Sequence, residues 1–270
     1  MASSYSDLHQ YRQCPRVYGF QKLGYKPIMQ PEPLTTGQLV HAGLAAHFRG
    51  TDMEEAIGTE SFKLTVPKDH QFSHVAILDM QGIIEHSVRR SIELSTRYIT
   101  HWVSDYQSPV PETVLEIEGV ICHPDLTAIY KNSRVIVDYK TSYHPDTRWY
   151  DISGQLDLYA YIRWLITEED TGYVIYDIIS EEGIYRHMRK PRVDAGERLF
   201  WEIKELEELQ DTEDEDKTLC IIAGFLNYPH PAYTCPSRCK FFIPCHLLDT
   251  DSWATSFDYL EANYLKRGEA

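Results

Sequence analysis

The 270-residue sequence predicts an α/β fold, in which a core of strands is surrounded by several helices. Apolar runs rich in β-branched and aromatic residues, such as residues 134–142 and 172–179, are typical of strands. Residues 73–105 carry isoleucine and valine near helical spacing, which indicates a long helix. A hydrophobic content of 43% allows a substantial core, and no repeat or low-complexity linker divides the chain, so we predict one domain over residues 1–270.

Helices dominate the predicted N-terminal part. Residues 6–14 repeat apolar positions at helical spacing, and Pro15 is expected to end that helix. A second helix is predicted at residues 37–48, after a turn-rich segment. Together with the long helix, the region from about residue 45 to residue 110 is predicted to be a largely helical insertion.

Strands and one helix follow in order. Residues 119–130 read as one strand, and residues 131–134 supply the turn that leads into the strand at residues 134–142. The remaining elements are a helix at residues 153–165 and a strand pair at residues 172–179 and 183–188.

The strand at residues 134–142 carries two opposite charges near its end. Side chains alternate along a strand, so Asp138 and Lys140 share one face, and the Tyr139 carbonyl lies within reach of anything that Asp138 binds. A carboxylate that holds a divalent cation, beside a lysine that faces a phosphate, suits phosphodiester hydrolysis. The alternative is an exposed hairpin whose charges are solvated.

A second carboxylate, Asp125, is expected at the same place. If the hairpin turns symmetrically between Asn132 and Ser133, Asp125 lies directly opposite Lys140 and diagonal to Asp138. Two neighbouring carboxylates repel each other unless a cation lies between them, which indicates a Mg²⁺ or Mn²⁺ site.

Four of the six cysteines suggest another metal centre. Cys235, Cys239 and Cys245 are close together in the sequence, whereas Cys14 lies near the N-terminus in a Cys-Pro pair. No signal peptide or long apolar span is evident, so we expect an intracellular, cytoplasmic protein. Disulfides are disfavoured in that compartment, and clustered thiols there indicate a metal.

Thiolate chemistry alone leaves the identity of this metal open. Sulfur ligands suit both zinc and iron–sulfur clusters. A zinc site would use the three late cysteines with His230 or His246 and would leave Cys14 free. An unmetallated cluster of core cysteines is the third interpretation, and Cys122 and Cys220 are expected to be core residues because they lie in apolar runs.

Several motifs resemble the PD-(D/E)XK nuclease superfamily. Asp125 and Asp138-Tyr139-Lys140 are similar to its acidic residue and its D/E-x-K element. Gln155-Leu156-Asp157-Leu158-Tyr159 resembles the Q-x-x-x-Y helix of the RecB-like branch, and Gly37-Gln38-Leu39-Val40-His41 resembles its G-x-x-x-H element. The resemblance extends from Ser6 to Cys245 and implies a restriction-endonuclease-like fold with a mixed central sheet flanked by helices.

The resemblance also implies roles for individual residues. The implied ligands of one or two Mg²⁺ or Mn²⁺ ions are His41, Asp125, Asp138 and the Tyr139 carbonyl. Lys140 would orient the attacking water or stabilise the charged transition state, and Gln155 and Tyr159 would position the substrate backbone.

The cysteine pattern resembles the iron–sulfur subgroup of RecB-like nucleases, which includes the CRISPR-adaptation exonucleases and the nuclease domain of AddB. In that subgroup, four cysteines hold a 4Fe-4S cluster that joins the N-terminal and C-terminal segments. The residues implied here are Cys14, Cys235, Cys239 and Cys245. The expected protein is a metal-dependent DNA exonuclease acting on single-stranded ends, with a helicase, recombination or CRISPR-adaptation partner and no membrane association.

The net charge of −15, from 26 basic and 41 acidic residues, is unusual for a DNA-binding protein, because most duplex binders are basic. Residues 202–217 hold nine acidic and two basic residues and are expected to form a solvated helical face or loop. A nuclease that grips only a few nucleotides tolerates this charge, because stacking contributes about 1–3 kcal/mol per base. Two other classes stay open: a non-catalytic DNA-end-binding module, and a zinc-stabilised adaptor whose acidic segment contacts a basic partner.

Overall fold

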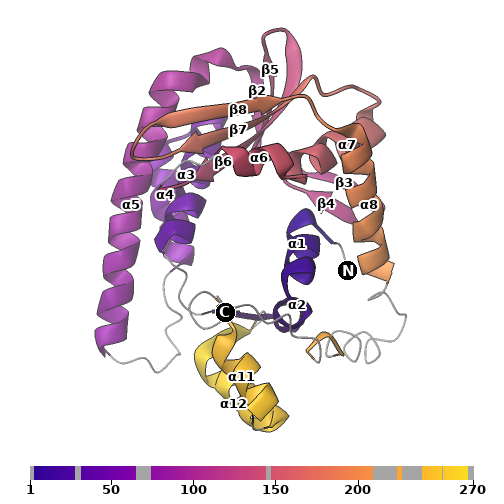
Figure 1. Cartoon of the computed structure of the whole chain (residues 1–270). Coiled ribbons are helices and arrows are strands. Elements are labelled where there is room, and N and C mark those ends of the chain that lie inside the picture. Colours follow the sequence, from indigo (N-terminus) through magenta and orange to yellow (C-terminus); the bar gives the residue numbers. More distant parts are fainter. Residues whose placement is uncertain are drawn as a thin grey trace. The chain divides into compact units, whose positions relative to one another are not determined.

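The computed structural model describes residues 3–27, 32–64, 74–143, 147–208, 224–226, 239–250 and 252–266. Its helices and strands form two compact units, one of residues 30–201 and one that combines residues 1–29 with residues 202–270 (Figure 1). The larger unit contains a five-stranded sheet and the residues predicted to be catalytic. The smaller unit contains both terminal segments.

The central sheet is mixed, as predicted. Its strands lie in the order β2-β5-β6-β7-β8. Their bounds are Gln107–Pro111 for β2, Leu126–Tyr130 for β5, Ser133–Thr141 for β6, Tyr173–Ile179 for β7 and Ile184–Arg189 for β8. Among these five strands, β6 and β7 run parallel and the other neighbours run antiparallel. The parallel pair needs a crossover, which the helices between β6 and β7 supply.

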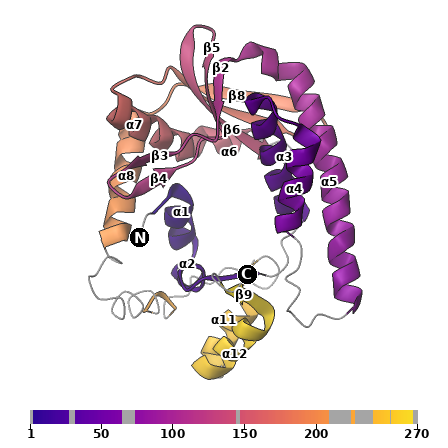
Figure 2. The same cartoon turned by 180° about the vertical axis from the view of Figure 1, so that it is seen from behind.

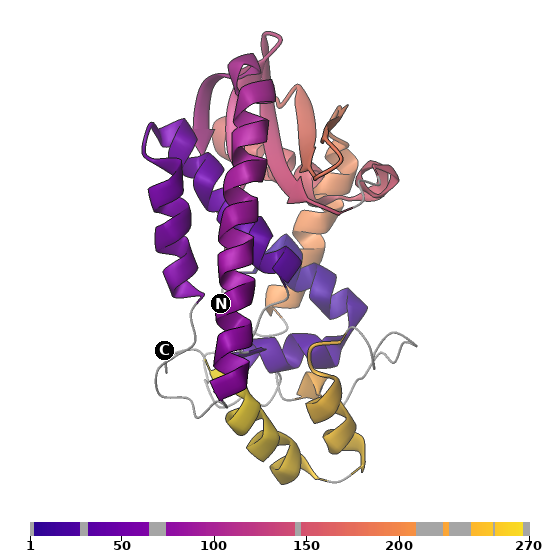
Figure 3. The ribbon, with the colours of Figure 1, turned by 90° about the vertical axis from the view of Figure 1, so that its left-hand side faces the viewer.

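Three helices lie together on one side of the sheet. α3 (Glu32–Arg49) and α5 (His74–Trp102) contribute Leu44 and other apolar side chains to a buried core with Val137 of β6. α4 (Met53–Lys63) packs against α3. Figure 2 shows the three helices grouped together, and Figure 3 shows α5 as one long, continuous helix. α5 and the short 3₁₀ helix that follows it account for the long helix predicted at residues 73–105.

A buried charge cluster fixes α5 on the sheet. Asp177 of β7 is fully buried and accepts hydrogen bonds from the hydroxyls of Tyr98 (2.6 Å) and Tyr106 (2.8 Å) and from Arg186 Nε (2.7 Å). Burial, together with the nearby charges, raises the pKa of Tyr98 well above its ordinary value, so its hydroxyl stays a donor. Every member of this network has a partner, which is the condition under which buried polar groups stabilise a fold.

The crossover helices are α6 (Arg148–Ile152) and α7 (Gln155–Thr167). They lie on the face of the sheet opposite to α3 and α5, and Gln155 of α7 accepts a hydrogen bond from Lys140 there. α8 (Val193–Glu208) packs closely on α7, because a Cβ added at Gly196 would lie only 2.4 Å from the backbone oxygen of Asp157. Part of the acidic run, residues 202–208, lies in α8, and residues 209–217 lie outside the described residues.

The close approach of α8 to α7 predicts a stability effect. Gly196→Ala should lower the free energy of unfolding by about 1–3 kcal/mol, because the added methyl group meets backbone that cannot move aside. Gly58→Ala in α4 is the matched control, since a Cβ there meets open space and alanine favours a helix. Chemical denaturation of both variants measures the difference. Equal stability of the two variants would contradict this packing.

The strand predicted at residues 119–130 is wrong. The structure has two strands there, β4 (Val120–Cys122) and β5, in different sheets. β4 pairs with β3 (Leu115–Ile117) in a separate hairpin. Pro124 explains the break, since proline has no N–H for a ladder and restricts the residue before it.

The predicted register of the β5–β6 hairpin is also wrong. Tyr130 pairs with Ser133, so the turn consists of Lys131 and Asn132, which have positive φ angles of 49° and 62°. Two left-handed residues form the tight turn that matches the twist of a hairpin. Continuing this register places Asp125 beside Asp138 instead of opposite Lys140.

The smaller unit brings the two ends of the chain together. α1 (Tyr5–Gln13) and α2 (Pro15–Lys22) lead into β1 (Tyr25–Pro27), which pairs with β9 (Tyr264–Lys266). The other elements of this unit include α11 (Phe242–Thr250) and α12 (Trp253–Asn263). Their shared core contains Phe20, Tyr25, Leu226, Phe241 and Leu260.

The N-terminal helix ends at Gln13, as predicted, but Pro15 also starts α2. Cys14 is extended between the two helices, and proline is well tolerated at the first helical position. Among the described residues, no helix combines the length and apolar character that a membrane span requires.

Candidate active site

The site forms where β5 stops pairing with β6. The last pair is Leu126 with Val137, and Asp125 precedes β5 directly. Beyond this point, the Tyr139 N–H donates to Asp125 Oδ2 (2.7 Å), and the Tyr139 carbonyl accepts from His41 Nε2 (2.9 Å). Backbone groups of β6 are therefore satisfied by side chains that can also bind a cation.

His41 reaches this place because α3 approaches the end of β6 closely. A Cβ at Gly37, one helical turn before His41, would lie 3.0 Å from Thr141 Oγ1. Glycine at this position therefore allows the contact. A pocket of about 640 Å³ beside the site is lined by His41, Tyr139 and Lys140, with residues of α3 and α4.

His41 is held between two acceptors. Its Nδ1 lies 2.9 Å from Asp125 Oδ1, and its Nε2 faces the Tyr139 carbonyl, so both nitrogens donate in this arrangement. Burial disfavours the charged ring, but the Asp125 carboxylate outweighs burial and raises the pKa of His41. The imidazolium therefore neutralises one carboxylate of the site.

Lys140 neutralises the other carboxylate. Its Nζ lies 2.5 Å from Asp138 Oδ2, and Asp138 is only 3% exposed. Burial alone would lower the pKa of Lys140, but the Asp138 and Asp125 carboxylates outweigh it and raise that pKa. Burial raises the pKa of Asp138, and Asp125 adds to this shift while Lys140 opposes it. At the end of β6, the two carboxylates are thus balanced by two positively charged side chains, His41 and Lys140.

The network continues onto α7. Lys140 Nζ donates to Gln155 Oε1 (3.3 Å), and Gln155 Nε2 donates to the Tyr159 hydroxyl (2.9 Å). Gln155 and Tyr159 are four residues apart, so they share one face of the helix. All the residues predicted for the site therefore meet: His41, Asp125, Asp138, Tyr139, Lys140, Gln155 and Tyr159.

The donor set fits a hard divalent cation. Two carboxylates, a backbone carbonyl and one imidazole are ligands typical of Mg²⁺ or Mn²⁺. Within the part of the chain that the structure describes, no three His, Cys, Asp or Glu side chains are arranged to hold a metal ion. His41 Nδ1 contacts Asp125 Oδ1 and Lys140 Nζ contacts Asp138 Oδ2, which are oxygens that a cation would bind.

Tyr176 is a member of the site that the sequence did not predict. It pairs with Asp138 across the parallel strands and therefore lies on the same face. Burial raises the pKa of Tyr176 to about 12, and its hydroxyl lies 3.0 Å from Ser153 Oγ. The apolar pattern of β7 predicted the strand, but a parallel register cannot be read from either strand alone.

Three of the four predicted cluster cysteines lie in the smaller unit, and Cys235 lies outside the described residues. Arg16 Nη1 donates to Cys245 Sγ (3.2 Å) and to Asp249 Oδ2 (2.9 Å). Burial raises the pKa of the Cys245 thiol, Arg16 opposes this shift, and the nearby Cys14 adds to it. Cys14 and Cys245 thus lie in the same compact unit, although they come from opposite ends of the sequence.

The cysteines predicted to belong to the core are Cys122, which is buried, and Cys220, which lies outside the described residues. Of the histidines considered for zinc, His246 is in α11 and His230 lies outside the described residues. The structure thus brings the N-terminal and C-terminal cysteines into one unit.

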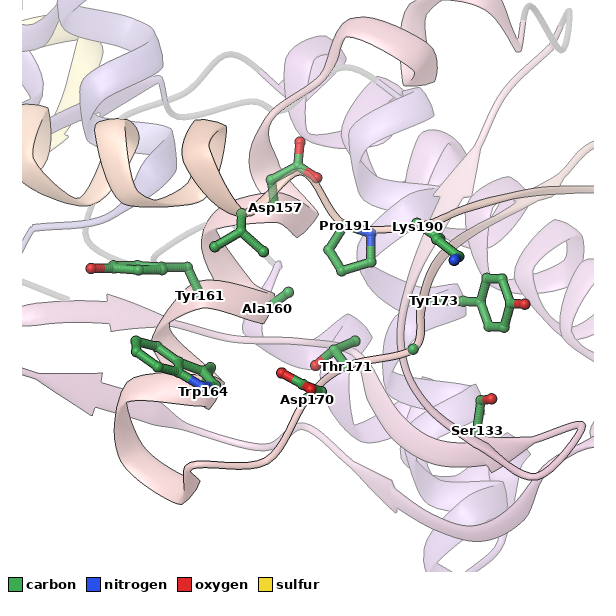
Figure 4. Close-up of a pocket in the computed structure, with 12 residues that line it drawn as sticks. Ser133, Asp157, Ala160, Tyr161, Trp164, Asp170, Thr171, Tyr173, Lys190 and Pro191 are labelled. Atoms are coloured by element: carbon green, nitrogen blue, oxygen red, sulfur yellow. The ribbon is translucent and has the colours of Figure 1, made fainter.

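A second pocket, of about 510 Å³, lies at the opposite ends of β6 and β7 (Figure 4). Ser133 and Tyr173, near the starts of the two strands, line it together with Tyr161 and Trp164 of α7. Its buried carboxylate, Asp157, is already neutralised by two arginines of the larger unit. This pocket therefore contains none of the cation-binding groups found at the ends of β5 and β6.

Sequence and structure comparisons relate the chain to known proteins. The family model of the PD-(D/E)XK nuclease superfamily matches residues 2–246. No curated protein matches the sequence. One solved structure, titled "Crystal structure of SSO0001", is 14% identical, and the match covers 63% of this chain and 73% of that chain with a TM-score of 0.29. Because the family model covers most of the sequence, including every residue of the network at the end of β6, the chain belongs to the PD-(D/E)XK nuclease superfamily.

Proposed function

We propose that this protein is a divalent-metal-dependent DNA exonuclease of the RecB-like branch that acts on single-stranded ends. The observation that supports this most is the single hydrogen-bonded network from His41 through Asp125 and Tyr139 to the Asp138–Lys140 pair. Nucleases of this superfamily use Mg²⁺ or Mn²⁺. The alternative of an exposed, solvated hairpin is disfavoured, because Asp138 is buried.

The proposed cation ligands are His41, Asp125, Asp138 and the Tyr139 carbonyl. A bound Mg²⁺ or Mn²⁺ ion supplies a water of lowered pKa and neutralises charge on the phosphate. His41 must lose a proton before it can act as a ligand, so cation binding and deprotonation are linked. The positive charges of His41 and Lys140 hold the carboxylates in place until then.

Lys140 is proposed to stabilise the negative charge that develops on the phosphate. Its side chain is 32% exposed, and it lines the pocket beside the site, so a substrate phosphate could reach it. Gln155 Oε1 accepts a hydrogen bond from the Lys140 ammonium group and so orients it. Gln155 is oriented in turn by the hydrogen bond that it donates to the Tyr159 hydroxyl. A preorganised donor of this kind needs little rearrangement in the transition state.

The net charge favours a short single-stranded contact over a long duplex contact. With 41 acidic and 26 basic residues, an extended phosphate footprint would be repelled. Affinity for single strands should therefore fall only modestly with salt, with a logarithmic slope of about −0.7 for each neutralised phosphate and only a few phosphates involved. Filter binding at several salt concentrations measures this slope.

The end requirement is tested with matched linear and circular single strands of one sequence. Linear DNA should be degraded to completion in Mn²⁺, whereas the circle and covalently closed duplex should persist. Rapid cutting of closed circles would identify an endonuclease and would contradict the exonuclease proposal, while leaving the superfamily unaffected.

We further propose that Cys14, Cys235, Cys239 and Cys245 hold a 4Fe-4S cluster. Cys14, Cys239 and Cys245 lie in one compact unit, in which β1 also pairs with β9. Thiolates are the usual ligands of such clusters. When bound, the cluster would link the two terminal segments. It would have no part in the catalytic network of the larger unit, where the divalent cation would bind.

A further inference from the structure

α6 lies on the sheet face that carries the catalytic pair. The ring of Tyr150 lies 4.7 Å from the ring of Tyr176, which is the cross-strand partner of Asp138. Along the chain, α6 comes between Lys140 and Gln155, which are hydrogen-bonded to each other. Figure 1 shows α6 beside α7. The helix is therefore part of the rim of the site.

The backbone of α6 and the residue after it is held by two arginines. Arg192 Nη1 donates to the Asp151 carbonyl (2.9 Å), and both Arg189 Nη2 and Arg192 Nη2 donate to the Ser153 carbonyl (2.9 Å each). Both arginines are fixed in turn by the fully buried carboxylate of Asp157. Asp151 also pairs with His187 Nε2 at 3.2 Å. α6 is thus a rigid platform.

Two large apolar side chains of α6 are exposed to solvent. Trp149 is 58% exposed and Ile152 is 66% exposed, and their spacing places them on the same face of the helix. Single exposed apolar residues are ordinary on protein surfaces. Here, however, the pair stands on a fixed helix beside the catalytic face, and the exposed, basic Arg148 is next to it.

We propose that Trp149, supported by Ile152, stacks on a nucleobase of the single strand close to the scissile phosphate. This inference rests on the proposed nuclease function and names the part of the substrate that α6 recognises. Stacking needs no positive charge and tolerates every base, so it suits an enzyme with a net charge of −15. A rigid tryptophan binds with little loss of conformational entropy, because α6 is already ordered. Trp149 would act as a positioning residue.

The test measures binding separately from cleavage. Affinity for a short oligodeoxythymidine is determined in EDTA by fluorescence anisotropy for the wild type, Trp149→Ala, Trp149→Phe and Trp164→Ala. Trp149→Ala should raise Kd about tenfold, the scale of losing one stacked base, and Trp149→Phe should keep most of the affinity. Trp164, 45% exposed and lining the distant pocket, is the matched control and should leave Kd unchanged.

A scan with single abasic nucleotides locates the contact. One abasic position should weaken binding by the wild type about tenfold and should have no effect on Trp149→Ala. In Mn²⁺, the variant should raise KM with little change in kcat. Equal DNA binding by Trp149→Ala and the wild type, or no position whose effect depends on Trp149, would overturn the proposal. Loss of a dimer in Trp149→Ala with unchanged DNA binding would overturn it in favour of contact with a second copy.

The two proposals fail in different ways. If the wild type binds the oligonucleotide in EDTA with a Trp149-dependent position but cleaves no DNA in Mn²⁺ or Mg²⁺, the nuclease proposal is wrong. If the wild type cleaves and Trp149→Ala binds and cleaves like it, only the stacking inference is wrong.

Discussion

Replacing Asp138 or Lys140 by alanine is expected to reduce DNA cleavage at least ~10²-fold, the scale of removing one preorganised electrostatic group. Asp138 is a proposed cation ligand, and Lys140 is proposed to place its positive charge beside the substrate phosphate. Each substitution also leaves its partner unpaired, since the two side chains form a 2.5 Å ion pair. In Asp138→Ala, Lys140 still bonds Gln155 and is partly exposed. In Lys140→Ala, the unpaired Asp138 can take up a proton, because burial already raises its pKa. The fold should therefore persist in both variants.

Cleavage is measured with end-labelled single-stranded DNA, using protein that is free of host nucleases. Arg134→Ala is a matched control, because Arg134 also forms an ion pair on β6, with Glu169, but near the start of the strand. That exposed pair contributes little to stability, and its loss should leave the rate unchanged. Normal digestion by both Asp138→Ala and Lys140→Ala would show that the residues at the end of β6 do not form the active site.

Cys14→Ala is expected to prevent binding of the proposed iron–sulfur cluster and to lower thermal stability strongly. Cys14 and Cys235 are 221 positions apart, so a shared cluster closes a very long loop. By analogy with a disulfide, such a cross-link removes roughly 5 kcal/mol of unfolded-chain entropy. Arg16, which bonds Cys245 and Asp249, would still hold the terminal segments in part.

Iron content and colour measure this effect directly. Anaerobically purified wild type should be brown, with about four irons per chain. Cys14→Ala and Cys239→Ala should both lose the colour. Cys122→Ala is the control, because this buried cysteine should affect packing and not iron. Full iron in Cys14→Ala with none in Cys239→Ala would disprove the bridging role of Cys14, and a colourless protein that contains zinc would favour the zinc site.

Part of the candidate site could be predicted from local signals, since Asp138 and Lys140 stand out as two charges in an apolar strand. His41, Gln155 and Tyr159 are ordinary residues in their helices, and only the resemblance to the motifs of the superfamily indicated them. The sequence could not predict how these residues are placed relative to one another. The turn at Lys131 and Asn132 depends on left-handed backbone angles that neither residue type dictates, and the register followed from them.

The fixed platform at α6 could not be predicted for a related reason. Asp157 lies inside the Q-x-x-x-Y motif, and the sequence gives no sign that Arg189 and Arg192 both bind it. Periodicity reports which face of an element is apolar, but ion pairs between residues more than thirty positions apart depend on the packed fold. The sequence context of Trp149 alone therefore does not indicate the role proposed for it.

The central claim, metal-dependent cleavage from single-stranded DNA ends, is tested most directly by one time course. Linear single-stranded DNA labelled at either end is incubated with the wild type in Mn²⁺ or Mg²⁺ and sampled over time, with EDTA as the blank. We predict progressive shortening from an end in the presence of the metal and intact DNA in EDTA. Intact DNA in both metals, from folded protein that carries its cluster, would contradict the account.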